Sequence, residues 1–159
     1  MNTTPIRDAY RVFLDAAATV AGTGPSTPPP GEWNADQILA HVSIVSAATI
    51  AAAANVAAGV NATYDNRVAH DSWTLDHVVT LAGGNAGLQD RIRRQGEALA
   101  AFDSAGLSDV ELDTLVPARL ISKGAALVDG PLRLRDILTG IADSELPGHT
   151  AQLLALIEA

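Results

Sequence analysis

Hydrophobic residues recur at spacings of three and four residues in four stretches of this 159-residue chain, and each stretch predicts a helix. In the first stretch the apolar face consists of Ile6, Tyr10, Phe13, Leu14 and Ala17. Two glycines and the segment PSTPPPGE cannot continue that helix and end it. The predicted helices run from about Pro5 to Val20, from Asn34 to about Ala58, from Asp71 or Ser72 to about Phe102, and from near Pro131 to the C-terminus.

The second predicted helix has a well-defined start. Asn34 is a good N-cap, and Gln37 stands at the position that completes a capping box. Trp33 and Ile38 occupy the two positions of a hydrophobic staple. The polar stretch VNATYDNRVAH follows this helix, and we interpret it as a crossover loop.

Two regions depart from simple helical periodicity. Four glycines weaken the third helix and predict a bend or a close contact: Gly83, Gly84, Gly87 and Gly96. Residues 107–130 mix short apolar runs with Pro117, Gly124 and the pair Asp129-Gly130, a pattern typical of extended segments and turns. The expected fold class is all-α: one domain over residues 1–159, a four-helix bundle with a long crossover between helices two and three and a short extended segment before helix four.

The composition limits the classes of partner that we expect the protein to bind. The formal net charge is -8, with 18 acidic and 10 basic residues, which argues against nucleic-acid binding. Arg91, Arg93 and Arg94 form the one local basic cluster, and a solvated helix face explains it. The apolar run from Ala47 to Val60, about 14 residues, is too short to span a membrane. The start of the chain is not a secretory signal, so we expect a cytoplasmic protein.

The residues with the most distinctive chemistry lie on the core-facing stripes of two predicted helices. In the last helix, Glu145 and His149 fall on the core side, one turn apart. In the second helix, His41 lies on the stripe that also contains Ile38 and Val45. Burying such groups is unfavourable unless something satisfies them. A divalent metal would neutralise the carboxylate and engage both imidazole lone pairs, so His41, Glu145 and His149 form a candidate metal site.

Two other interpretations stay open at this point. Each histidine could donate to a backbone carbonyl, or Glu145 could pair with a protonated histidine. Pro147 lies between Glu145 and His149, removes a helical hydrogen bond and crowds the carbonyl of Asp143. Either this turn is distorted and aims the two side chains, or the helix breaks and the spacing argument weakens.

Three segments carry a family resemblance: EWNADQILAHV, LVDGPLRLRDIL and SELPGHTAQLL. With them the chain resembles the DinB-like (YfiT-like) four-helix bundle superfamily, whose helices run up-down-down-up. In that superfamily a histidine of helix two and an HxxxH pair of the last helix bind a divalent metal. Glu145 replaces the first histidine of that pair, which is similar to the mycothiol-dependent maleylpyruvate isomerase branch, where His, Glu and His bind zinc. The resemblance also suggests a homodimer.

The leading hypothesis is a metal-dependent enzyme that uses a low-molecular-weight thiol, mycothiol by the resemblance, for S-transfer or isomerisation of a small electrophilic substrate. Zinc is the first candidate metal, and nickel or iron are alternatives. The sequence has no cysteine, so the thiol must come from outside the chain. One alternative is a metal-dependent hydrolase that activates water. Another is a non-catalytic helical module that dimerises or binds a small ligand.

Several further polar residues are secondary candidates. His77 could approach the site from the start of helix three, although a partly exposed structural role is favoured, and His70 is expected in a loop. The remaining candidates are Arg119 and Lys123 for an anionic substrate, and Asn85 and Gln89 for a pocket lining.

Overall fold

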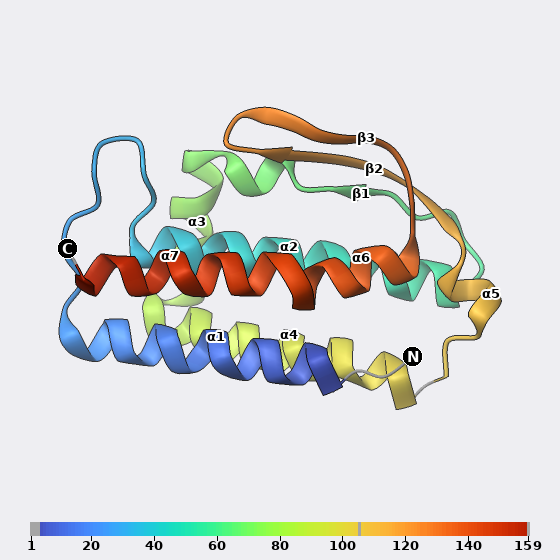
Figure 1. The fold of residues 1–159 in the computed structure, drawn as a ribbon, viewed down its shortest axis with the longest axis horizontal. Helices are drawn as coiled ribbons and strands as arrows, with labels where there is room; N and C mark the ends of the chain where they lie inside the picture. The colour runs from blue at the N-terminus through green and yellow to red at the C-terminus, as the bar shows by residue number, and fades with distance from the viewer. Residues whose placement is uncertain (1–3, 105, 159) are drawn as a thin grey trace.

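Four long helical segments lie side by side along the molecule (Figure 1). The computed structural model describes residues 4–104 and 106–158. The segments are α1 (Thr4–Thr23), α2 (Ala35–Ala57), α4 (Asn85–Ser104) and the continuous run of α6 (Leu134–Gly140), η2 (Ile141–Glu145) and α7 (Leu146–Glu158). Around the bundle, α1 neighbours α4 and α7, and α2 contacts α4 and α7 from the other side. The seams α1–α4 and α2–α7 are therefore opposite each other.

A small β-sheet covers part of this bundle, and it makes the predicted all-α fold class wrong. Strand β1 (Tyr64–Asp65) pairs in parallel with β2 (Leu115–Ser122), and β2 pairs in antiparallel with β3 (Ala125–Arg133). The sheet lies along α2 and α6 (Figure 1). β1 joins it from the segment interpreted as a crossover loop, so the protein is a helical bundle with a three-stranded mixed sheet.

The β2–β3 hairpin turns at Lys123-Gly124. Both residues have positive φ, 50° and 76°, as a two-residue hairpin turn requires. A turn suggested by the pair Asp129-Gly130 is not formed, because both residues lie inside β3 and pair with β2. Short helix α5 (Asp109–Leu112) precedes β2, and its Asp109 pairs with Arg135 of α6.

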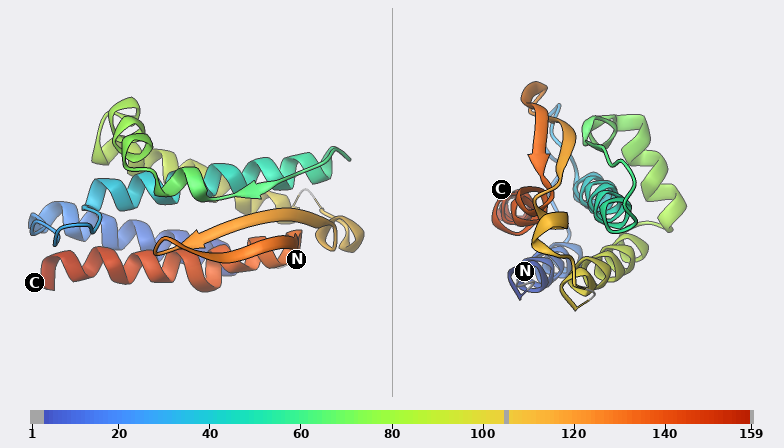
Figure 2. Two further views of the ribbon diagram at one scale, coloured as in Figure 1. Left: turned by 90° about the horizontal axis from the view of Figure 1, so that it is seen from above. Right: turned by 90° about the vertical axis from the view of Figure 1, so that its right-hand side faces the viewer.

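The third predicted helix is two helices. α3 (Ser72–Ala82) ends where Gly83 and Gly84 adopt left-handed φ of 80° and 84°, and α4 starts afresh at Asn85. The chain turns sharply there, and α3 lies across the bundle and packs against α2 and α4 (Figure 2). Gly96 makes the expected close contact, because a Cβ at this position would lie 2.7 Å from Cγ of Tyr10. Glycine at 96 thus lets α1 and α4 approach closely.

Helix α2 is the centre of the core and begins as predicted. The capping box is confirmed: the Gln37 N–H donates to Asn34 Oδ1 at 2.9 Å, and the Asn34 N–H donates to Gln37 Oε1 at 3.2 Å. Within the described residues, α2 is the one helix long and apolar enough to cross a membrane. However, 61% of its apolar window is buried inside the fold, which is consistent with a core helix of a soluble protein.

Candidate metal centre

His41 is buried on α2 with its ring orientation fixed by a main-chain carbonyl. His41 is 1% exposed, and its Nδ1 lies 2.7 Å from the carbonyl oxygen of Ala69. A carbonyl can only accept, so Nδ1 carries the proton and donates it. Nε2, the other ring nitrogen, lies 2.9 Å from Oε1 of Glu145. The fold therefore turns the potential ligand atom of His41 toward Glu145.

The turn containing Pro147 is distorted but unbroken. Residues Ile141–Glu145 form a π-helix, in which the N–H of Leu146 donates to the carbonyl of Ile141, five residues back. This wider turn lets the helix continue through Pro147, which has no N–H to donate. Glu145 and His149 remain on one face, with Glu145 Oε1 and His149 Nε2 3.3 Å apart. Of the two outcomes left open by the sequence, the aimed turn is the one found.

His149 has the same arrangement of ring nitrogens as His41. Its Nδ1 donates to Oε1 of Gln152, one turn later on α7, at 2.9 Å. This contact leaves Nε2 directed at Glu145. Both imidazoles are thus held through Nδ1 by an acceptor outside the cluster, as is usual for histidines that bind a metal through Nε2.

The three side chains are electrostatically coupled. Burial alone would raise the pKa of the Glu145 carboxyl, but hydrogen bonds and charge from His149 and His41 outweigh it and hold that pKa well below its usual range. Burial alone would lower the pKa of His149, but the hydrogen bond and the negative charge of Glu145 raise it. Glu145 is accordingly a carboxylate in the metal-free cluster, and its charge favours the protonated form of His149.

The donor set and its spacing fit a divalent metal. The ligand atoms of His41, Glu145 and His149 all lie within 4.8 Å of one another. Two ligands, each about 2.0–2.1 Å from a zinc ion, would be roughly 2.9–3.4 Å apart for angles between a right angle and the tetrahedral value. The two pairs that involve Glu145 measure 2.9 Å and 3.3 Å. These three residues, predicted from the sequence, could therefore hold a metal ion.

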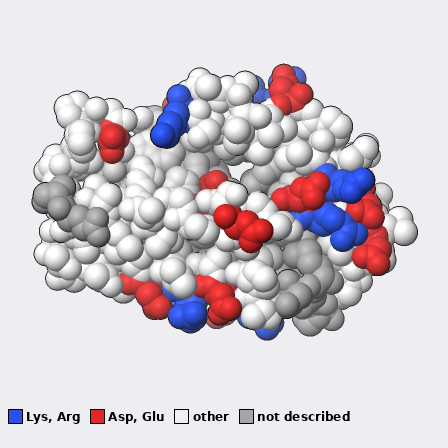
Figure 3. All heavy atoms as spheres, viewed as in Figure 1, with Lys and Arg blue, Asp and Glu red and all other residues white. Residues whose placement is uncertain are grey.

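The cluster opens to solvent on one side. The His41 side chain is 2% exposed, whereas those of His149 and Glu145 are 17% and 28% exposed. The surface is hollowed between the sheet and α7, on the face shown in Figure 3. A metal held here would have coordination positions left for an incoming small molecule.

Trp33 and His70 also belong to the site, although the sequence interpretation gave neither a role there. The indole of Trp33 lies over three imidazoles, with ring centroids 4.7 Å from His41, 5.4 Å from His70 and 6.2 Å from His149. His70 packs edge-on against His41 at 4.9 Å. It ends the short helix η1 (Arg67–His70) instead of lying in a loop. The NRVAH segment gave no signal for this placement, because the contacts are long-range.

Two buried tyrosines lie in the core beside the cluster. The hydroxyl of Tyr10 lies 2.6 Å from Ser46 Oγ, and that of Tyr64 lies 3.2 Å from Thr49 Oγ1. Burial, with a smaller contribution from the charge of Glu145, raises the pKa of Tyr64 to about 12. The pKa of Tyr10 is raised for the same reasons, with Tyr64 adding to the effect. Both phenols stay protonated and connect α1 and β1 to α2.

The secondary candidates fall elsewhere. His77 is exposed on α3 and stacks on Trp73 with a centroid distance of 5.0 Å. Arg119 pairs with Asp129 across the hairpin at 3.5 Å, and Lys123 forms its turn. The amide of Asn85 donates to Asp36 at 2.7 Å, so Asn85 ties α4 to α2.

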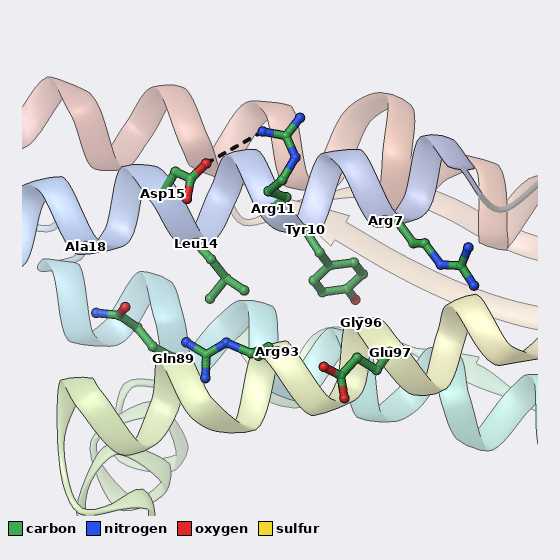
Figure 4. Close-up of a pocket in the computed structure, with 10 residues that line it drawn as sticks. All are labelled: Arg7, Tyr10, Arg11, Leu14, Asp15, Ala18, Gln89, Arg93, Gly96 and Glu97. Carbon is green, nitrogen blue, oxygen red and sulfur yellow. Dashed lines mark ion pairs between the residues drawn. The ribbon is translucent and has the colours of Figure 1, made fainter.

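Gln89 does line a pocket, as proposed, but not at the metal ligands. The pocket has a volume of about 420 Å³ and lies in the α1–α4 seam, opposite the α2–α7 seam (Figure 4). Its floor includes Tyr10 and Gly96, and charged side chains such as Arg93 and Glu97 extend along it. Arg11 at its rim pairs with Asp15 at 3.7 Å.

Comparisons with known proteins found no match: no protein-family model matches the chain, and neither a curated protein nor a solved structure is significantly similar to it. The geometry of the site and the resemblance in the sequence motifs are therefore the two indications of function.

Proposed function

We propose that this protein is a metal-dependent enzyme in which His41, Glu145 and His149 bind a divalent ion, with zinc as the first candidate. We further propose that it uses a low-molecular-weight thiol, mycothiol by the family resemblance, for S-transfer to or isomerisation of a small electrophilic substrate. The observation that carries this proposal is the convergence of two Nε2 atoms and one carboxylate oxygen within 4.8 Å. Both Nδ1 atoms are already engaged, by the Ala69 carbonyl and by Gln152.

The residues of the chain supply binding, orientation and charge. Glu145 contributes one negative charge, and the two imidazoles contribute none in their metal-binding form. A divalent ion in this set would keep a net positive charge and favour an anionic fourth ligand. When bound, such an ion would lower the pKa of a coordinated thiol and so supply a thiolate near neutral pH.

The surroundings favour an external thiol for this position. The chain has no cysteine to fill it. Trp33 packs against the imidazoles from one side, while the partly exposed Glu145 and His149 leave an approach from the solvent. A thiolate approaching there would attack an electrophilic carbon of the substrate.

Turnover with a chromogenic dinitrohalobenzene tests the proposal. In this reaction a sulfur–carbon bond forms, the carbon–halogen bond breaks, the halide leaves and the thiol proton goes to solvent. We expect zinc-loaded protein to accelerate this reaction with mycothiol, His77→Ala to retain the activity and His149→Ala to lose it.

Two results would contradict the thiol-dependent function. Hydrolysis of p-nitrophenyl acetate that needs the metal but no thiol would identify a hydrolase instead. Rates equal to the protein-free control for both reagents would favour the non-catalytic module.

A further inference from the structure

The sheet joins the metal centre at Asn66. This residue follows β1 and directly precedes η1, the short helix that contains Ala69 and His70. Its backbone N–H donates to the carbonyl of Arg119 on β2 at 3.2 Å. Asn66 therefore stands at the point where the main chain leaves the sheet.

The Asn66 side chain continues the strand pairing beyond that point. Its Oδ1 accepts from the N–H of Ile121 at 2.8 Å, and its Nδ2 donates to the carbonyl of Ile121 at 3.1 Å. An amide side chain has the same donor and acceptor as a peptide group, so it can imitate one more step of a β-ladder. Ile121 adjoins the irregularity in the β2–β3 register, between Leu120 and Ile121.

The same residue fixes the turn behind His41. The N–H of Ala69 donates to the carbonyl of Asn66 at 2.9 Å, which closes η1. The carbonyl of Ala69 is the acceptor for Nδ1 of His41 at 2.7 Å. Nδ2 of Asn66 also lies 3.4 Å from Nε2 of His70, whose ring packs on His41. The hydrogen bond from His41 to Ala69 and the packing of His70 on His41 thus both depend on the segment that Asn66 holds.

We infer that Asn66 is a positioning residue of the metal site, which holds the Ala69 carbonyl against Nδ1 of His41 and so keeps Nε2 of that ring directed at Glu145. The inference rests on the metal site proposed above. It gives the sheet a role in metal binding, because β2 has to present Ile121 for Asn66 to be held. Without that support, the His41 ring would be free to turn away from the other two ligand atoms.

Asn66→Ala tests the inference with two measurements: the zinc Kd from competition with a chelator, and the solvent exchange of the His41 Nδ1–H proton, followed by ¹H–¹⁵N NMR of metal-free protein. We expect the Kd to rise by about 10- to 100-fold, the usual effect of removing an outer-shell partner. We also expect this proton, which donates to the Ala69 carbonyl in wild type, to exchange faster in the variant. A residue that merely stabilised the sheet would leave this proton protected in the folded protein.

Two control variants separate positioning from stability. Val116→Ala removes a buried side chain of β2, 1% exposed, and weakens the sheet without changing Asn66 or Ile121. It is expected to keep the wild-type exchange rate of the His41 Nδ1–H proton and the wild-type Kd in the folded protein. Asn66→Asp keeps an acceptor for the Ile121 N–H but loses the donor, so its Kd should lie between those of wild type and Asn66→Ala.

Three results would overturn the inference: unchanged exchange of the His41 Nδ1–H proton in Asn66→Ala, a wild-type Kd in that variant, or a Kd raised equally by Val116→Ala. If Asn66→Ala does not fold, Asn66→Asp is judged by the first two results. A wild-type protein that binds no zinc would refute the proposed function, whereas the exchange measurement would still test Asn66, because it is made without metal.

Discussion

Each of the two tryptophans in this protein stacks on histidine, in very different surroundings. Trp73 and His77 are neighbours on one face of α3, four residues apart, and Trp73 is 71% exposed. That pair is a local consequence of helical spacing.

Trp33 lies instead over three histidines that come from separate elements. They are supplied by α2, η1 and α7: His41, His70 and His149. Such convergence needs the whole fold, and Glu145 lies at its centre between two Nε2 atoms. A histidine beside an aromatic ring is therefore weak evidence of a functional site. Imidazoles that the fold brings together from distant segments around a carboxylate are much stronger evidence of one.

The largest difference between the two regions should appear in metal affinity. Glu145→Gln removes the ligand charge with little change in shape, and we expect the zinc Kd to rise by more than the roughly 100-fold upper range for an outer-shell partner. His77→Ala should leave the Kd unchanged, since His77 is on α3 with Trp73. Titration against a chromophoric chelator measures both. Equal Kd values for Glu145→Gln and His77→Ala would show that the two regions do not differ in this way.

As pH rises through the titration of His149, the stability of the metal-free protein should fall, whereas the affinity for zinc should rise. Glu145 raises the pKa of His149 despite its burial, so the imidazolium–carboxylate pair stabilises the metal-free protein below the unfolded-state histidine pKa, about 6.5. That contribution is lost as pH rises through the folded-state value. At the acid end, the depressed pKa of Glu145 makes its contribution present above the unfolded-state value, about 4.3, and lost as pH falls toward its folded-state pKa.

Metal binding requires both imidazoles to be neutral, so zinc affinity should instead rise with pH and level off above the raised pKa of His149. Thermal unfolding of metal-free and zinc-loaded protein from pH 5 to pH 8 measures both trends, with Glu145→Gln as the control for other titrating groups. A zinc Kd that does not change with pH would contradict the ion-pair account of the metal-free cluster.

Fluorescence should distinguish the two tryptophans directly. Trp33 lies within 6.2 Å of all three imidazole centroids that it covers, so a bound paramagnetic ion such as Co²⁺ should quench it. Most of the quenching should persist in Trp73→Phe and disappear in Trp33→Phe. If Co²⁺ mainly quenched the fluorescence of Trp73, the bound ion would lie at α3 instead.

The smallest expected difference is in stability. Trp33 is partly buried against the core, so Trp33→Ala should lower the free energy of unfolding by about 1–3 kcal/mol, less than for a fully buried tryptophan. Trp73→Ala removes a mostly exposed ring and should change it by no more than about 0.5 kcal/mol. Urea unfolding of metal-free protein measures both, and equal losses would mean that the exposed pair is more structural than its surroundings indicate.

The clustering of the three candidate metal ligands could be predicted because their signal is local. Glu145 and His149 share a stripe through i,i+4 spacing, and His41 lies on the inner stripe of a helix whose start is marked by a capping box. The π-helix absorbed the effect of Pro147 and preserved that spacing. No local sequence pattern predicts a π-helical turn, so the sequence left open whether Pro147 distorts the helix or breaks it.

The extended segments expected within residues 107–130 correspond to β2 and most of β3, but β1 was missed because its pairing is non-local. Tyr64 pairs with Ala118, and nothing in the two short segments identifies them as partners. Asp129-Gly130 has the composition of a turn, but it pairs with β2 because Lys123-Gly124 sets the hairpin register. Likewise, the Gly83-Gly84 pair was expected to bend one helix, and its two positive φ angles separate two helices.

The positions of Trp33 and His70 depend on this missed architecture. His70 reaches His41 because Asn66 anchors η1 to β2. Trp33 was expected as one half of a hydrophobic staple, and periodicity could not indicate that its ring would also cover imidazoles from three elements.

The central claim is that one divalent ion is bound by residues of α2, η2 and α7. Elemental analysis of purified, tag-free protein tests it most directly, on wild type beside His41→Ala, His149→Ala and His77→Ala. We predict about one zinc, nickel or iron ion per chain in wild type and in His77→Ala, and almost none in the other two variants. Equal metal content in all four proteins would contradict the site.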